Sequence, residues 1–337
     1  MKRVTIIGAG IAGLTTALAL AERGAEVTII EKSATLGAGA CSRFAGGMLA
    51  PWCERESAEE IVLELGKEAL TYWRRILPDT QVNGTLVVAQ RRDLADLDRF
   101  SRMTRGFEWV DGDRIAELEP DLAGRFGRGL FFPEESHINP REAIAVLGRR
   151  LADMGVSFRF GTDGETVDAD SDVVVDCRGL AARDHLTDLR GVKGEMLILR
   201  CPDVSFARPI RLLHPRIPFY VVPRGDGVFM LGATMIESDD RSRITARSMV
   251  ELLNSAHALH PAFAEAEILE IGTDARPAFP DNLPRIRRHG RTVYVNGFYR
   301  HGFLLSPSVS RMAAAVILDN AYFPEVMDEG DDQRRIA

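Results

Sequence analysis

Cysteine is scarce in this chain, and its placement excludes two common uses. Only four cysteines occur among 337 residues, and none of them forms a CxxC pair: Cys41, Cys53, Cys177 and Cys201. Structural metal sites and disulfide scaffolds need cysteines at short, repeated spacings, so neither is indicated. We therefore expect no metal site and a reducing cytoplasm as the compartment.

Long apolar runs and an excess of positive charge are also missing. No stretch of about 18 apolar residues occurs, so we expect no membrane span. The net charge is -7, which leaves no basic face for nucleic acid. Lys2 and Arg3 precede an apolar run, but the glycines inside it, and Glu22 and Arg23 after it, are unlike a secretory signal. Because 337 residues exceed one ordinary core of about 250–300, two domains are expected.

The N-terminal segment carries the strongest motif. Residues 4–31 read as a buried strand, a glycine turn, an amphipathic helix and a second strand that ends on Glu31. Gly8 permits the turn, Gly10 lets the backbone approach a pyrophosphate, and Gly13 lets the helix lie close on the sheet. The helix N-terminus attracts phosphate, and an acid at position 31 can bind both ribose hydroxyls. This pattern predicts a dinucleotide site that disfavours NADP.

The remaining chain divides into an α/β part and an antiparallel part. Helices are expected over 58–76, 141–154 and 246–259, and two more within 91–119. Strands are expected over 84–90 and 172–179, in several segments between 193 and 277, and near 292, before a C-terminal helix. A loop over 36–52 is expected to face a ligand. We therefore predict an α/β fold. A discontinuous Rossmann-type domain (1–80, 141–190 and 277–337) would adjoin a substrate domain (81–140 and 191–276), whose mostly antiparallel sheet carries covering helices.

Five further segments give the chain a family resemblance. They are AGGML at 45–49, FYVVPR at 219–224, GATM at 232–235, ARP at 275–277 and YRHGFLLSP at 299–307. In this order, and over nearly the whole chain, they resemble the FAD-dependent enzymes of the D-amino acid oxidase superfamily, and within it the glycine oxidases of thiamine biosynthesis. The resemblance implies noncovalent FAD and oxidation of the Cα–N bond of an amino acid.

The same resemblance implies where the cofactor binds. Pyrophosphate would lie over the first glycines, the adenosine end near positions 31 and 167, and the flavin between the 41–48 loop and the 300–304 loop. Main-chain N–H groups of the last loop would stabilise negative charge on the reduced flavin. The implied cofactor-binding residues are Gly8, Gly10, Ile11, Ala12, Gly13, Glu31, Lys32, Cys41, Ser42, Ala45, Gly46, Gly47, Met48, Val167, Gly179, Arg300, His301, Gly302, Phe303 and Leu304.

On the substrate side the resemblance implies Arg300, Tyr220 and Arg276. A guanidinium binds a carboxylate through two parallel charge-assisted bonds. Arg300 is the first choice, because its loop is apolar and an unpaired charge there would be costly to bury without a ligand. Tyr220 would bind the same carboxylate, and Arg276 would line the pocket or support it. No general base is evident, and none is needed if a neutral amine loses a hydride from Cα to the flavin.

Other interpretations of these residues stay open. An arginine considered alone is most often a solvated surface residue, and Tyr220 could equally be a core aromatic. Met48 and Met235 are more often core residues than pocket walls. His301 and His137 resemble candidate bases, but a structural role is expected for both.

The expected function is oxidation of glycine or another small amino acid to its imine. Oxygen would accept the electrons and yield hydrogen peroxide, and the imine would supply thiamine thiazole synthesis. Three alternatives stay open: a D-amino acid or proline-type dehydrogenase that passes electrons to a quinone or carrier, a flavin-binding redox module without turnover, and an NAD-dependent dehydrogenase, which would be colourless. Because members of the family are often tetrameric, a homo-oligomer is a further expectation.

Overall fold

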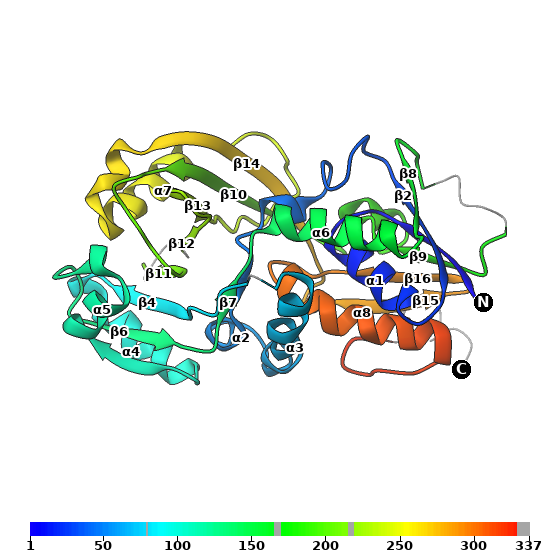
Figure 1. Cartoon of the computed structure of the whole chain (residues 1–337), viewed down its shortest axis with the longest axis horizontal. Helices are drawn as coiled ribbons and strands as arrows, with labels where there is room; N and C mark the ends of the chain where they lie inside the picture. Colours follow the sequence, from blue (N-terminus) through cyan, green and yellow to red (C-terminus); the bar gives the residue numbers. More distant parts are fainter. Residues whose placement is uncertain (79, 165–169, 215–218, 329–337) are drawn as a thin grey trace.

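The computed structural model of the chain describes residues 1–78, 80–164, 170–214 and 219–328. Its two large sheets lie side by side along the long axis of the molecule, with the N-terminus at the outer end of one of them (Figure 1). Each sheet has its own hydrophobic core, and segments that are far apart in sequence build both.

The first sheet has the order β15-β16-β9-β1-β2-β8. Its strands are β1 (Arg3–Ile7), β2 (Glu26–Glu31), β8 (Ser157–Phe160), β9 (Val173–Asp176), β15 (Arg285–His289) and β16 (Thr292–Asn296). All neighbours are parallel except β15 and β16. Because parallel strands end at the same edge, residues that follow β1, β2 and β9 meet at one crevice. The runs VTII and VVV are mostly apolar because helices and loops cover both faces of the sheet.

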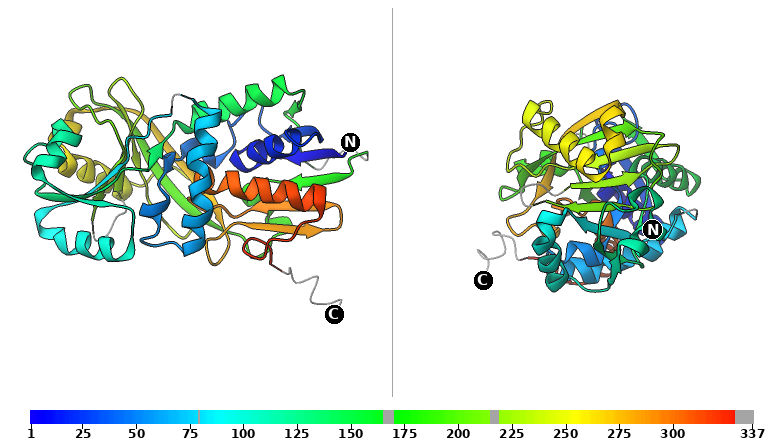
Figure 2. Two further views of the ribbon diagram at one scale, coloured as in Figure 1. Left: turned by 60° about the horizontal axis from the view of Figure 1, so that its bottom comes forward. Right: turned by 90° about the vertical axis from the view of Figure 1, so that its left-hand side faces the viewer.

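Four helices surround this sheet: α1 (Ile11–Ala21), α3 (Glu60–Ile76), α6 (Pro140–Asp153) and α8 (Gly302–Asp319). Figure 2 shows α1 and α8 next to each other, and the Thr15 hydroxyl lies 2.7 Å from that of Ser310 between them. By length and composition α8 could cross a membrane, although no such stretch was expected from the sequence. However, 72% of its apolar window is buried inside the fold. It is the core helix of this half of the molecule.

The second sheet has the order β14-β10-β13-β12-β11-β4-β6-β5. Its strands are β4 (Thr85–Ala89), β5 (Glu108–Asp111), β6 (Arg128–Phe132), β10 (Arg190–Arg200), β11 (Ile210–Leu213), β12 (Phe219–Pro223), β13 (Val228–Gly232) and β14 (Glu267–Ala278). Only the β11–β4 pair is parallel. Alternate residues of β4 belong to opposite faces: Leu86 and Val88 pack in the core under α7 (Ala246–Leu259), whereas Val87 and Ala89 pack with α4 (Leu94–Met103).

The expected fold class is confirmed, and three local expectations are wrong. Between α4 and α5 (Gly112–Leu118) the structure adds the strand β5, which the 91–119 segment hid because its side chains are mostly exposed. The expected loop over 36–52 contains the 3-10 helix η1 (Cys41–Phe44), the strand β3 (Met48–Leu49), which pairs with β7 (Ser136–His137), and the start of helix α2 (Pro51–Glu54). The expected 300–304 loop ends at residue 301, because Gly302 already begins α8.

Candidate active site

A cavity of about 890 Å³ lies where the two sheets meet. Its wall includes Ile7 and Glu31 at the ends of two parallel strands, and Met196 and Tyr220 from the antiparallel sheet. A cavity of this size falls within the range of cofactor and ligand sites. It therefore occupies the crevice that the parallel-strand topology predicts.

The first glycine turn is shaped to bring backbone close to a ligand. Gly8 has φ +100°, which a residue with a side chain rarely adopts. A Cβ at Gly13 would lie 1.9 Å from the carbonyl oxygen of Gly8, so only glycine lets α1 begin this close to the strand. Gly8 and Gly10 line the cavity, whereas Gly13 lies behind them and acts through packing.

Two helices begin at the cavity wall. Ile11 begins α1 and Gly302 begins α8, and a Cβ at Gly302 would lie 3.2 Å from the side chain of Ile11. The first N–H groups of a helix have no partner within it and carry partial positive charge. Both helix N-termini therefore favour negative charge in the same cavity. The donors expected from a loop at 302–304 come instead from the first turn of α8.

Glu31 lies at the cavity with its carboxylate held by the main chain. Oε2 accepts a hydrogen bond from Ala9 N–H, and Oε1 accepts one from Ser33 N–H, both at 2.8 Å. Each carboxylate oxygen can accept a second hydrogen bond. Lys32 is at the rim, where its ammonium pairs with Asp163 at 3.2 Å. An acid fixed in this way at the end of β2 suits the hydroxyls of a ribose.

The segment before β3 forms another part of the wall. A Cβ at Gly46 would lie 2.9 Å from the ring of Tyr220, so glycine lets this loop approach β12. Burial raises the pKa of the Cys41 thiol to about 11, with Asp274 acting in the same direction. Cys41 is therefore a neutral thiol at ordinary pH and a poor nucleophile.

Most residues named from the sequence as cofactor ligands line this cavity. Gly13 does not line it, and Val167 falls outside the described residues. Those on the wall are Gly8, Gly10, Ile11, Ala12, Glu31, Lys32, Cys41, Ser42, Ala45, Gly46, Gly47, Met48, Gly179, Arg300, His301, Gly302, Phe303 and Leu304. Within the described ranges no cluster of His, Cys, Asp or Glu could hold a metal ion. The cradle, the acid and the helix N-termini fit a dinucleotide such as FAD.

Arg276 lies on the cavity wall and belongs to β14 of the antiparallel sheet. Its Nη1 donates to the carbonyl of Thr234 at 3.1 Å, and it has no carboxylate partner among the residues that the structure describes. A Cβ at Gly194 would lie 2.2 Å from Nη2, so the bare backbone of Gly194 makes room for this guanidinium. Arg276 thus has donors left for an anionic ligand.

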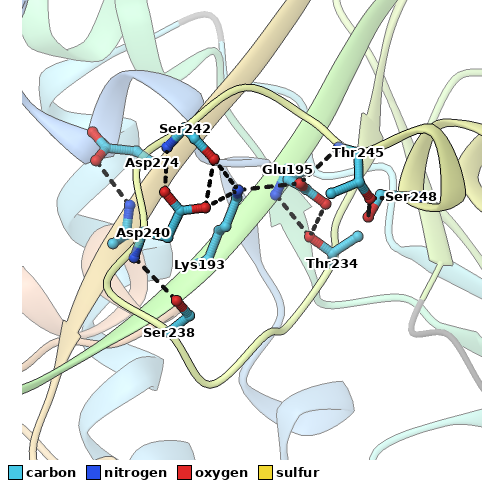
Figure 3. A network of polar contacts seen from close by, with 10 residues as sticks. Lys193, Glu195, Thr234, Ser238, Asp240, Ser242, Thr245, Ser248 and Asp274 are labelled. Atoms are coloured by element: carbon cyan, nitrogen blue, oxygen red, sulfur yellow. Dashed lines mark hydrogen bonds and ion pairs between the residues drawn. The ribbon is translucent and has the colours of Figure 1, made fainter.

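A buried polar network holds the carbonyl partner of Arg276 in place (Figure 3). The Thr234 hydroxyl accepts from Glu195 N–H at 2.9 Å and donates to Glu195 Oε2 at 3.0 Å. On the same strand, Lys193 Nζ donates to Asp240 at 2.8 Å and lies 3.6 Å from Glu195. The segment after β13 is therefore fastened to β10 at both ends.

Tyr220 faces the same region. A Cβ at Gly232 would lie 2.8 Å from its hydroxyl oxygen. Burial raises the pKa of Tyr220, although the nearby guanidinium of Arg276 acts in the opposite direction. The hydroxyl therefore keeps its proton and can donate to a carboxylate.

Arg300 is not an unpaired charge, contrary to the expectation from the sequence. Its Nη2 lies 2.8 Å from Oε2 of Glu54, and it also donates to the Ser57 hydroxyl at 2.7 Å. Arg211 pairs with the other oxygen of Glu54. Burial would raise the pKa of Glu54, but Arg300, Arg211 and His301 together hold it well below its ordinary value. Glu54 is therefore an ionised carboxylate inside the cavity wall.

The two histidines named from the sequence have different surroundings. His301 is buried on the cavity wall, with Nε2 2.9 Å from Glu54, and burial lowers its pKa. His137 belongs to β7, and burial lowers its pKa to about 4. Both rings are therefore neutral near pH 7. Nε2 of His301 lies 3.2 Å from Nε of Arg300 as well as 2.9 Å from Glu54, so the tautomer determines whether it accepts from the guanidinium or donates to the carboxylate.

Glu54 and Arg211 were missed by the sequence reasoning. Glu54 ends a helix of four residues, and Arg211 lies inside the strand β11, so neither belongs to a recognisable motif. Their contact joins positions 157 residues apart in sequence. The only sequence signal was Arg211 in the apolar run PIRLL, whereas Glu54 begins the polar run ERES and does not stand out.

The fold and this site define a class of protein. The class is that of the flavin-type oxidoreductases. It is indicated by a glycine turn that leads into a helix N-terminus, by an acid on the second strand, and by an antiparallel sheet that contributes Tyr220 and Arg276.

Comparison with known proteins gives the family. The sequence pattern of the FAD dependent oxidoreductases matches residues 3–316, so the chain belongs to that family. A Rhizobium etli protein with the provisional name thiamine biosynthesis oxidoreductase ThiO is 56% identical over 96% of this chain and 98% of its own length. The glycine oxidase of Geobacillus kaustophilus is 28% identical over 93% of this chain and 92% of its own. The crystal structure of Bacillus cereus glycine oxidase has a TM-score of 0.80, with 24% identity and 96% of both chains covered.

Proposed function

We propose that this chain oxidises glycine or another small amino acid to the imine and passes the electrons to oxygen, which yields hydrogen peroxide. One observation carries the proposal: Arg276, without a carboxylate partner among the described residues, faces a cavity whose other end has the form of a dinucleotide cradle. The glycine oxidases among its relatives are consistent with such a substrate. When bound, FAD supplies the two-electron acceptor for a hydride from Cα.

In this proposal Arg276, and not Arg300, is the principal ligand of the substrate carboxylate. Arg300 already has an ionic partner in Glu54, whereas Arg276 has only a carbonyl. Tyr220 would donate its hydroxyl to the same carboxylate. A fixed carboxylate orients Cα, and orientation of this kind can supply a large part of the rate enhancement.

The chain's own residues also favour the neutral amine that hydride loss requires. Arg211 and Arg300 contribute two positive charges around one ionised Glu54, and His301 is neutral. With Arg276 the substrate end therefore keeps a positive balance. A nearby positive charge disfavours an ammonium group and lowers its pKa.

The physiological role follows by similarity. The Rhizobium etli relative is named for thiamine biosynthesis, and we propose that this chain supplies an imine to the same pathway. A cofactor domain of 1–80, 141–190 and 277–337, a substrate domain of 81–140 and 191–276, a cytoplasmic location and a homo-oligomeric state belong to the same proposal. The four free cysteines are consistent with a reducing compartment.

One experiment tests both cofactor and substrate. Purified holoenzyme is mixed anaerobically with glycine, sarcosine or D-alanine while flavin absorbance is followed. We expect at least one of them to bleach the flavin, and oxygen to restore the colour with one equivalent of peroxide. A flavin that stays oxidised with all three would overturn the proposal. Bleaching that oxygen does not reverse, but a dye does, would make the enzyme a dehydrogenase.

A further inference from the structure

The wall of the cavity holds an internal anion. The side chain of Glu54 is only 10% exposed, and its two oxygens face three cationic or hydrogen-bonding groups. Oε2 lies 2.8 Å from Nη2 of Arg300 and 2.9 Å from Nε2 of His301, and Oε1 accepts from Nη2 of Arg211. The carboxylate therefore occupies the position where two guanidiniums converge.

Glu54 is the direct ion-pair partner of both arginines, and Glu135 acts on Arg211 only from a longer distance. In the described part of the chain, Glu54 is the only acid within ion-pair distance of Arg211 or of Arg300. Nε of Arg211 is buried without a hydrogen-bond partner. The side chains of Arg211 and Arg300 are only 15% and 20% exposed, and partly buried guanidiniums without a counter-ion are costly, so removal of Glu54 would leave an anion site.

The cavity thus has two cationic regions that differ in one respect. Arg276 is without a carboxylate partner, whereas the Arg211 and Arg300 pair is neutralised in part by Glu54. Tyr220 lies between the regions, because it is opposite Arg211 on β11 and opposite Gly232 on β13, two residues before the Thr234 carbonyl that Arg276 contacts. A ligand that is held by Arg276 and is long enough to pass Tyr220 would reach a region that already contains a carboxylate.

We propose that Glu54 is a specificity-determining residue that restricts the site to amino acids with a single carboxylate. The inference rests on the proposed function. A second carboxylate on the ligand would meet the negative charge of Glu54, and the arginines that could bind it would be occupied. Glycine and other monocarboxylic amino acids avoid this conflict. Loss of the charge at residue 54 would turn the region around Arg211 and Arg300 into a binding site for a second carboxylate.

The wild-type holoenzyme tests this without any substitution. Acetate, malonate and succinate cannot donate an α-hydride from an amine, and their binding can be followed by the change in flavin absorbance. We expect the dissociation constants of malonate and succinate to be equal to, or larger than, that of acetate. If either dicarboxylate binds wild-type enzyme tenfold more tightly than acetate, Glu54 does not exclude a second carboxylate.

The variant Glu54→Gln supplies the complementary test. It keeps the shape and removes the charge, so we expect one of the two dicarboxylates to gain about tenfold or more in affinity relative to acetate, the size of one charge-assisted bond. The double variant E54Q/R211M should lose that gain. Glu56→Gln is the matched control, because Glu56 also lines the cavity but pairs with Arg99 at 3.0 Å. It should leave the preference unchanged.

The outcomes separate this inference from the proposed function. If flavin-loaded E54Q has the same affinity for dicarboxylates relative to acetate as the wild type, the role of Glu54 is overturned, even if glycine still bleaches the wild type. A preference that changes as expected, in an enzyme that glycine does not bleach, would support the role of Glu54 and reject glycine as substrate. If E54Q does not retain flavin, the role of Glu54 is tested with Glu54→Ala and with the affinities of the wild-type enzyme for acetate, malonate and succinate.

Iminodiacetate, an amine with two carboxylates, should be oxidised faster relative to glycine by E54Q than by wild type.

Discussion

The guanidinium of Arg276 donates to the main-chain carbonyl of Thr234 at 3.1 Å. A carbonyl fixes the direction of the side chain but does not neutralise its charge. Arg300 differs, because an ionised carboxylate lies 2.8 Å from it. The two arginines that the sequence placed at the substrate are therefore unequal: one is oriented with its charge available, and the other is part of the wall.

Replacement of Arg276 is expected to weaken substrate binding strongly and leave the cofactor in place. For Arg276→Met we expect KM for glycine to rise about 100-fold, because truncation of a buried charge pair costs roughly 2–5 kcal/mol. Arg276→Lys keeps the charge but not the fork, so it should recover only part of the loss. Steady-state kinetics at equal flavin content measure both. An unchanged KM in Arg276→Met would remove Arg276 from the substrate site.

A methyl group at position 194 tests the position of the same guanidinium. The Cβ of Gly194→Ala would lie 2.2 Å from Nη2 of Arg276 and would force that side chain to move. We expect KM to rise by at least tenfold, since a displacement of about 1 Å can cost 10²-fold. Gly127→Ala is the control, because nothing lies within 4 Å of its added methyl. Equal kinetics for the two variants would contradict this account.

The cofactor half of the molecule could be predicted because its chemistry is encoded locally. Gly8, Gly10, Gly13 and Glu31 lie within one strand-helix-strand unit, and the backbone requirements at Gly8 and Gly13 follow directly from the spacing. The position of Gly13 against the Gly8 carbonyl follows from the same pattern. The parallel order of β9, β1 and β2 then brings their ends to one crevice.

The substrate half could be predicted only in part, because its contacts are long-range. Glu54 meets Arg211 across 157 positions and His301 across 247. Local sequence shows an arginine in an apolar loop but not the carboxylate that the fold brings to it. An unpaired charge in this loop would be costly to bury, which is why Arg300 was expected to await a ligand, but the fold supplies Glu54 as its partner.

Glu31 offers a test of the adenosine end. Glu31→Gln replaces an acceptor of two main-chain N–H bonds with an amide, which can no longer accept at both ends. We expect FAD to bind about tenfold more weakly, measured by fluorescence on reconstitution of the apoprotein. Glu26→Gln is the matched control, because Glu26 is exposed at the start of the same strand, β2. Equal affinity of the two variants for FAD would exclude a role for Glu31.

Lys193 should matter for stability through the network in Figure 3. Lys193→Met leaves Glu195, which is fully buried, without its nearby cation at 3.6 Å, and frees Asp240. We expect the Tm of the holoenzyme to fall by several degrees. The double variant K193M/E195Q removes the orphaned charge and should recover part of the loss. Additive effects of the two substitutions would show that Lys193 and Glu195 act independently.

Glu135 should make stability depend on pH in a defined direction. It is fully buried and accepts from Cys53 N–H at 2.8 Å. Burial raises its pKa from 4.5 to about 7, although Thr85, Cys53 N–H and Arg211 act to lower it. A raised pKa means that the folded state holds the proton more tightly than the unfolded state. The resulting stability is complete below about pH 4.5 and is lost as the pH rises through about 7.

Glu135→Gln imitates the protonated carboxyl at every pH and therefore removes this dependence. Near pH 5 we expect its free energy of unfolding to be close to that of the wild type. Above pH 7 it should be higher by up to about 3 kcal/mol, because one pKa unit corresponds to about 1.4 kcal/mol. Thermal unfolding between pH 5 and 8.5 measures the difference. Glu108→Gln, at an exposed position of β5, should show no such trend. A difference between Glu135→Gln and wild type that stays constant over this range would mean that Glu135 is ionised throughout, and that Arg211 balances its charge.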